Sequence, residues 1–212
     1  IIPASFMLIL LYYSLPVFQG QFIYKNLRVE IPKQYFELVN FFKLQGKNER
    51  IATLPQSSFW GWTYTNWGYR GSGFIWFGIA QPSLDGAFLP WSKENENYYW
   101  ELTQAVYSSN KPSFEAVLEK YQINWVVVDQ SIISLYSPKA SGLEKLETLI
   151  NNSGKLRLSA KFGTINIYRV NLKNQQKKLN PLETNLPNIT PKYQWNNYDT
   201  AYLENGNYIT QN

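Results

Sequence analysis

A chain of 212 residues is long enough to bury one core, so a single domain with appendages accounts for its length. It contains no Cys and no His, which excludes thiol nucleophiles, imidazole bases and metal sites built from sulfur or nitrogen ligands. Its 20 basic and 15 acidic residues give a net charge of +5, and the basic residues are scattered apart from Lys173, Lys177 and Lys178. No basic stripe for nucleic acid is therefore predicted.

Residues 1–20 carry no charge and are predicted to be the end of a transmembrane helix. An apolar block from Phe6 to Leu11 precedes Tyr12 and Tyr13, and Tyr is enriched where helices leave a bilayer. A signal peptide is disfavoured because a basic region and a small-residue cleavage site are missing. A buried core helix is the alternative that remains open.

Residues 21–172 are predicted to form one extracytoplasmic α/β domain. Residues 21–31 fit a strand or an extended arm. Pro32 then begins a helix to about Leu44, whose apolar face follows helical spacing through Tyr35, Leu38, Val39 and Phe42. A short strand, Arg50 to Leu54, comes next.

Residues 56–91 are rich in Trp, Tyr, Gly and Ser and poor in charge, which predicts a long, ordered, irregular aromatic loop. Two helices follow, at 94–108 and 113–121. The β-branched run Ile123 to Asp129 is typical of a strand buried on both faces. A helix at 143–150 and a hairpin of strands 156–162 and 165–170 complete the domain. This order predicts an α/β fold with a small mixed sheet and flanking helices.

The C-terminal part of the sequence differs in composition from this domain. Residues 173–192 are polar, with Lys, Asn and Gln followed by repeated Pro, and are predicted to be a linker. Residues 193–212 regain aromatic side chains and are expected to begin a further, truncated module.

The aromatic loop supplies most of the candidate binding residues, because flat hydrogen-bonding side chains suit sugar recognition: an aromatic ring stacks on the sugar while Asn, Arg and Tyr bond its hydroxyls. The candidates are Trp62, Tyr64, Asn66, Trp67, Tyr69, Arg70 and Asp85. The alternative, which is slightly favoured, is that these rings pack on the protein's own transmembrane bundle, as in an interfacial aromatic belt.

The acidic residues do not predict a catalytic site. A glycosidase would need two carboxyl groups across the scissile bond, and Asp85 with Glu96 is the pair considered. Glu94 to Glu101 opens a helix, where acids are favoured by the exposed amides. Asp129 ends the buried strand, where a ligand group or a turn-forming residue can stand, the latter being favoured. No catalytic residue, metal ligand or cofactor is assigned to this chain, and whether a larger protein uses a divalent metal stays open.

The order of several short motifs resembles the junction between the membrane bundle and the soluble domain in the glycosyltransferase-C superfamily, including YfhO-like proteins and membrane arabinofuranosyltransferases. The motifs are Tyr13-Ser14-Leu15-Pro16 to Gly20, Val29-Glu30-Ile31-Pro32 with Tyr35, Arg50 to Pro55, and Asn66-Trp67-Gly68-Tyr69. The last motif, continued to Gly71, is also similar to the Trp-Trp-Asp-Tyr-Gly loop of oligosaccharyltransferase catalytic subunits, although it lacks the Asp. The resemblance spans about residues 10–172.

The resemblance implies a polytopic glycosyltransferase at the extracytoplasmic face of the cell membrane that uses a lipid-linked sugar donor and inverts the sugar carbon. It implies that the catalytic acid lies in an earlier loop, outside these residues. The expected partners are the protein's own transmembrane bundle, the membrane, the lipid-linked sugar and a glycan acceptor. The alternative is a membrane-tethered, non-catalytic carbohydrate-binding or surface-assembly module.

Overall fold

The computed structural model describes residues 2–20, 28–56, 62–72, 75, 78–83, 93–134 and 142–173. They belong to two compact units, 1–31 and 32–212. The first unit contains α1 (Ile2–Phe18), whose large apolar side chains from Phe6 to Phe18 are exposed. Ser14 Oγ donates to the Leu10 carbonyl at 2.7 Å, which satisfies its hydroxyl within the helix. Within the described ranges, no helix has both the length and the apolar character needed to cross a membrane.

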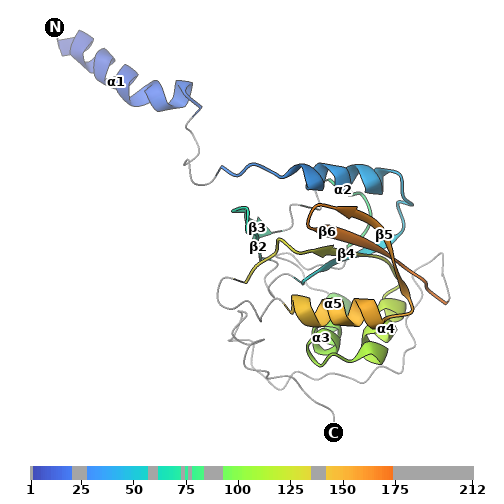
Figure 1. The fold of residues 1–212 in the computed structure, drawn as a ribbon. Helices are drawn as coiled ribbons and strands as arrows, with labels where there is room; N and C mark the ends of the chain where they lie inside the picture. The colour runs from blue at the N-terminus through green and yellow to red at the C-terminus, as the bar shows by residue number, and fades with distance from the viewer. Residues whose placement is uncertain are drawn as a thin grey trace. The chain divides into compact units, whose positions relative to one another are not determined.

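The second unit is built on a four-stranded mixed sheet. Its order is β1-β4-β6-β5, with β1 and β4 parallel and the other two pairs antiparallel. Five helices and six strands are found among the described residues: α1, α2 (Lys33–Lys43), β1 (Arg50–Leu54), β2 (Trp62–Tyr64), β3 (Arg70–Ser72), α3 (Lys93–Tyr107), α4 (Lys111–Lys120), β4 (Ile123–Asp129), α5 (Leu143–Asn152), β5 (Leu156–Phe162) and β6 (Ile165–Val170). Figure 1 shows α2 on one face of the sheet and α3, α4 and α5 on the other.

The side chains of the central strand β4 point alternately to the two faces of the sheet, and this divides the core into two clusters. Val126 and Val128 of β4 pack with α3, α4 and α5, whereas Trp125 and Val127 pack with α2. Successive side chains of a strand point to opposite faces, so a strand covered on both sides is apolar throughout. The sequence predicts a mixed-sheet α/β fold with flanking helices, and the structure confirms it and arranges it in three layers.

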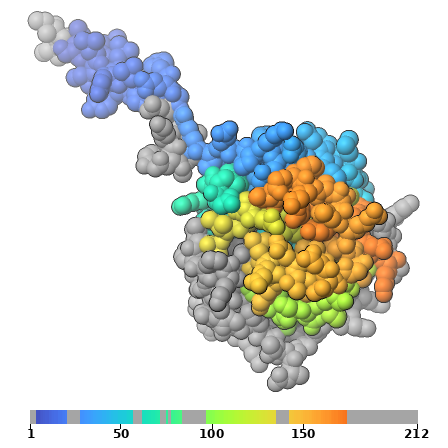
Figure 2. All heavy atoms as spheres, viewed as in Figure 1, coloured from blue at the N-terminus to red at the C-terminus, as the bar shows by residue number. Residues whose placement is uncertain are grey.

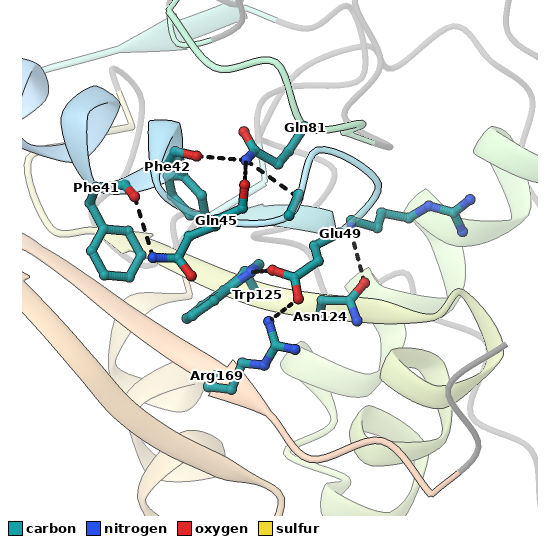
Figure 3. A network of polar contacts seen from close by, with 10 residues as sticks. Phe41, Phe42, Gln45, Glu49, Gln81, Asn124, Trp125 and Arg169 are labelled. Carbon is teal, nitrogen blue, oxygen red and sulfur yellow. Dashed lines mark hydrogen bonds and ion pairs between the residues drawn. The ribbon is translucent and has the colours of Figure 1, made fainter. Parts of the chain in front are cut away.

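A polar network joins the end of α2 to the sheet (Figure 3). Glu49 accepts from Trp125 Nε1 at 2.7 Å and pairs with Arg169 at 2.8 Å, and the Arg169 guanidinium lies 4.5 Å from the Trp125 ring centroid. Gln81 donates to the Phe42 carbonyl at 2.7 Å, close to the end of α2. Because helix ends leave carbonyls without intrahelical partners, Gln81 acts as a side-chain cap.

The secondary structure departs from the prediction in one segment. The stretch expected to be irregular, 56–91, contains the two short strands β2 and β3, which form a separate two-stranded sheet. Residues 28–31 form no strand, while 21–27 lie outside the described residues. The proposed linker beyond residue 173 and the proposed following module, 193–212, also lie outside them.

Candidate functional site

The β2–β3 hairpin gathers three of the predicted binding residues on one face. Tyr64 pairs with Arg70 and Trp62 pairs with Ser72 in the antiparallel register. Side chains directly opposite each other, and those two residues apart on one strand, share a face of a sheet. Trp62, Tyr64 and Arg70 therefore lie together, with the Trp62 and Tyr64 rings stacked at 6.5 Å and 19°. Trp62 and Arg70 are exposed, and Tyr64 is half-buried.

The turn of this hairpin is held by backbone and side-chain hydrogen bonds around Thr65. Its amide donates to the Tyr69 carbonyl at 3.0 Å, and its hydroxyl accepts from the Tyr69 amide at 3.0 Å. Gly68 has φ 100°, a conformation that side chains rarely adopt. Asn66, another predicted contact, is exposed at the turn.

The hairpin is attached where the two parallel strands end. The Asn66 amide donates to the Ser131 carbonyl at 2.9 Å, and the Ile133 amide donates to the Tyr64 carbonyl at 2.8 Å. Residues 131–133 follow β4 directly, so the hairpin extends the carboxyl edge of the β1–β4 pair, the edge at which α/β sheets present ligand groups. Figures 1 and 2 show the hairpin at the surface beside α2 and the segment after β4.

Trp67 and Tyr69 have a different orientation from the face residues. Trp67 packs against the core cluster under α2, and its Nε1 donates to Tyr35 Oη at 3.0 Å and lies 3.2 Å from Ser131 Oγ. Its ring is 5.3 Å from that of Tyr35, and Tyr69 stacks on it at 5.7 Å. Trp67 thus anchors the turn to the domain, and Tyr69 packs on the anchor.

Asp129 is directed into the domain. One carboxylate oxygen accepts the Ser131 amide at 2.9 Å, and the other accepts the Tyr35 hydroxyl at 2.5 Å. The first bond is the side-chain-to-backbone contact, two residues on, by which Asp forms a turn. Burial, reinforced by the neighbouring Asp129, raises the pKa of Tyr35 well above its ordinary value. Asp129 therefore has the turn-forming role that the sequence favours.

The remaining acidic candidates do not join this site. Asp85 and the side chains of Glu94 and Glu96 lie outside the described residues. Glu101 is buried and pairs with Lys120 at 2.6 Å. In the parts of the chain that the structure describes, three or more acidic side chains do not cluster in a way that could hold a metal ion.

Two residues of the site escape prediction from the sequence. The sequence places Tyr35 on the apolar face of a helix and in one motif of the resemblance, without a role for its hydroxyl, and it predicts no role for Ser131. Both bond Trp67 across more than 30 positions of sequence. The one local signal is Asp129 two residues before Ser131, since that spacing is typical of an Asp turn.

Neither a protein-family model nor a curated protein matches this sequence. Among solved structures, 69% of this chain matches arabinofuranosyltransferase AftD from Mycobacteria, with 14% identity and a TM-score of 0.55. A mutant of AftD matches over 68% of this chain, also with 14% identity and a TM-score of 0.55. The match covers 13% of the AftD chain, so this protein corresponds to a small part of that enzyme's length.

The C-terminal globular domain of an Archaeoglobus fulgidus oligosaccharyltransferase matches 67% of this chain and covers 99% of its own length, with 15% identity. Its TM-score of 0.41 is too low to show a shared fold. The AftD match is above that level and agrees with the resemblance to membrane arabinofuranosyltransferases. About two thirds of this chain therefore shares its fold with a small part of a mycobacterial arabinofuranosyltransferase.

Proposed function

We propose that this chain is the extracytoplasmic domain of a polytopic membrane glycosyltransferase that uses a lipid-linked sugar donor. Its hairpin contacts the sugar of the donor or the acceptor, and the catalytic residues lie elsewhere in the protein. The observation that carries the proposal is the hairpin face, on which Trp62, Tyr64 and Arg70 lie together at the carboxyl edge of the parallel strands.

The chemistry of this face suits a carbohydrate. Trp62 is 40% exposed and offers a flat apolar surface to the C–H groups of a sugar ring. Arg70 offers several N–H donors to hydroxyl or phosphate oxygens, and it is exposed beside the rings. Asn66 at the turn adds an exposed amide that can both donate and accept.

The membrane assignment is supported by α1. Its apolar side chains are exposed on all sides, whereas a helix lying on a water-facing domain needs only one apolar stripe. A bilayer or a surrounding transmembrane bundle would cover such a surface. We therefore place α1 in a membrane and the second unit at its extracytoplasmic face.

The described acids support a binding role over a catalytic one. Asp129 gives both carboxylate oxygens to the domain, and Glu101 and Glu119 pair with Lys120 and Lys155 at 2.6 Å each. Acids held in this way stabilise the fold. The fold shared with AftD, an arabinofuranosyltransferase, suggests arabinofuranosyl glycans as the first sugars to try.

The test is a titration of the full chain in detergent micelles with oligosaccharides, including arabinofuranosyl oligomers, and with polyprenyl-phosphate sugars. Binding is followed by Trp fluorescence for the unaltered chain and for Trp62→Ala and Arg70→Ala. We expect saturable quenching that weakens about tenfold or more in both variants, because each removes a direct contact of roughly 1.4 kcal/mol or more.

Arg157→Ala and Leu158→Ala are the matched controls, since both residues are exposed on β5 rather than on the hairpin. They should leave the affinity unchanged. Equal binding by the unaltered chain and both hairpin variants would move the sugar site elsewhere. No binding by a folded chain would overturn the proposed sugar contact and favour a hairpin that packs on the transmembrane bundle.

A further inference from the structure

A buried hydroxyl network lies beneath the hairpin. It consists of Tyr35 on α2, Asp129 at the end of β4, and Ser131, which are 2%, 3% and 1% exposed. Tyr35 Oη is 2.8 Å from Ser131 Oγ, and both oxygens are within hydrogen-bond distance of Trp67 Nε1. Tyr35 and Ser131, which are 96 residues apart in the sequence, thus meet at one indole nitrogen.

The chemistry of the four groups fixes the direction of these hydrogen bonds. A carboxylate only accepts, so Tyr35 donates its single hydroxyl proton to Asp129. The Tyr35 oxygen is then an acceptor, which suits the Ser131 hydroxyl as donor. An indole N–H only donates, and that of Trp67 is directed at the Tyr35 and Ser131 oxygens. Asp129 thus only accepts, Trp67 only donates, and the Tyr35 and Ser131 hydroxyls do both, so the indole has one favoured orientation.

Trp67 transmits this orientation to the binding face. It lies in the turn between β2 and β3, and Tyr69, which stacks on its ring, directly precedes Arg70. Two strands of three residues each have little stability by themselves, so their geometry depends on what anchors them. The anchor in this protein is Trp67 together with the backbone bonds to residues 131 and 133.

We infer that Tyr35, Asp129 and Ser131 are positioning residues that hold Trp67 and thereby preorganise the face formed by Trp62, Tyr64 and Arg70. The inference rests on the proposed sugar-binding function of that face. A site ordered before binding loses less conformational entropy when the ligand arrives, so loosening the anchor weakens affinity without removing any ligand contact.

The experiment compares Ser131→Ala and Trp67→Phe with the unaltered full chain in detergent micelles. Trp67→Phe keeps a ring in the turn but removes the N–H, so it tests the network even if Ser131→Ala fails to fold. Ser108→Ala is the matched control, because its hydroxyl bonds the Gln104 carbonyl at the end of α3. Two readouts are needed: the indole N–H resonances in ¹H–¹⁵N NMR, with Trp67 assigned from its missing signal in Trp67→Phe, and the affinity for the sugar that the unaltered chain binds.

We expect Ser131→Ala to move the Trp67 indole resonance and to weaken sugar affinity about fivefold to tenfold, the effect of losing one net hydrogen bond. Trp67→Phe should weaken affinity to a similar extent, and Ser108→Ala should change neither readout. A shifted resonance with unchanged affinity would overturn the positioning role and leave the sugar site intact. An unmoved resonance would show that Ser131 does not hold Trp67. If the unaltered chain binds no sugar, the proposed function fails first, and the positioning role fails with it.

Discussion

Tyr35 shows how much of this site depends on single buried atoms. Its hydroxyl joins α2, the end of β4 and the hairpin turn through contacts with Asp129, Ser131 and Trp67. The sequence predicts that Tyr35 is buried, because it follows the helical spacing of Leu38 and Phe42. The bonds of its hydroxyl are not predictable, since they join positions 94 and 96 residues away. Local spacing reports which face is buried but not which groups meet there.

Buried tyrosines lead to a prediction about alkaline stability. Burial raises the pKa values of Tyr35, Tyr99 and Tyr107 above their ordinary value. Unfolded tyrosine loses its proton near pH 10, while the folded protein retains it, so stability is fully present below pH 10 and is lost as the pH rises further. Each such tyrosine lowers the free energy of unfolding by about 1.4 kcal/mol per pH unit in that range.

The measurement is urea unfolding of the full chain and of Tyr35→Phe at pH 8 and at pH 11. At pH 8 the variant should lose roughly 1–3 kcal/mol, because Asp129 is left with an unsatisfied buried oxygen. Between the two pH values, the variant should lose less stability than the unaltered chain, because one of the three tyrosines is gone. Equal losses in both chains would contradict the assignment of Tyr35 as a group kept neutral by burial.

At the scale of elements, the β5–β6 turn gives a clean test of backbone conformation. Gly163 has φ 54°, and a Cβ built on it would lie 2.5 Å from Gln34 Oε1 of α2. Gly163→Ala should therefore destabilise the domain by about 1–2 kcal/mol, chiefly through the left-handed backbone. Thermal or urea unfolding would measure the loss.

Gly154→Ala is the control for that substitution. Gly154 lies between α5 and β5, and a Cβ there would meet nothing within 4 Å. It should be neutral or slightly stabilising, because alanine restricts the unfolded chain more than glycine does. If both variants lost the same stability, the backbone conformation of Gly163 would not be the cause.

Strong patterns made most elements predictable, and weak ones hid the hairpin. The helix at 33–43 has an apolar stripe, and the run Ile123–Asp129 is β-branched, so both are expected where they are found. By contrast, β2 and β3 contain three residues each and expose their aromatic face. They lack the inward apolar alternation that predicts a strand. Their pairing depends instead on Trp67 and on hydrogen bonds to residues 131–133, which are distant in the sequence. The binding candidates could be named from composition, but their grouping on one face required the pairing register.

At the scale of the whole molecule, the two units have opposite relations to solvent. The second unit carries both apolar core clusters, one between the sheet and α2 and the other between the sheet and α3, α4 and α5. Among the described residues of the first unit, the large apolar side chains from Phe6 to Phe18 are exposed. The stability of the α/β domain should therefore not depend on α1, whereas the dispersion of the full chain in water should.

This contrast predicts the behaviour of two chains, one of residues 1–212 and one of residues 28–173. The shorter chain should unfold in a single cooperative step and stay monomeric without detergent, because both of its core clusters are intact. The full chain should need detergent, since an exposed apolar surface of this kind associates in water. Circular dichroism during urea unfolding and light scattering on a sizing column would measure the two properties.

A variant of the full chain separates a membrane helix from a buried core helix. Leu8→Lys with Leu11→Lys places two charges on α1, which costs several kcal/mol for a helix inserted in an apolar phase. If α1 belongs in the membrane, detergent binding should fall while the unfolding of the α/β domain stays the same. If α1 instead packs on this domain, the double variant and the shorter chain would both lose stability, and the buried core helix would be the correct interpretation. The two interpretations thus differ in which of two measurable quantities changes, the detergent bound or the free energy of unfolding.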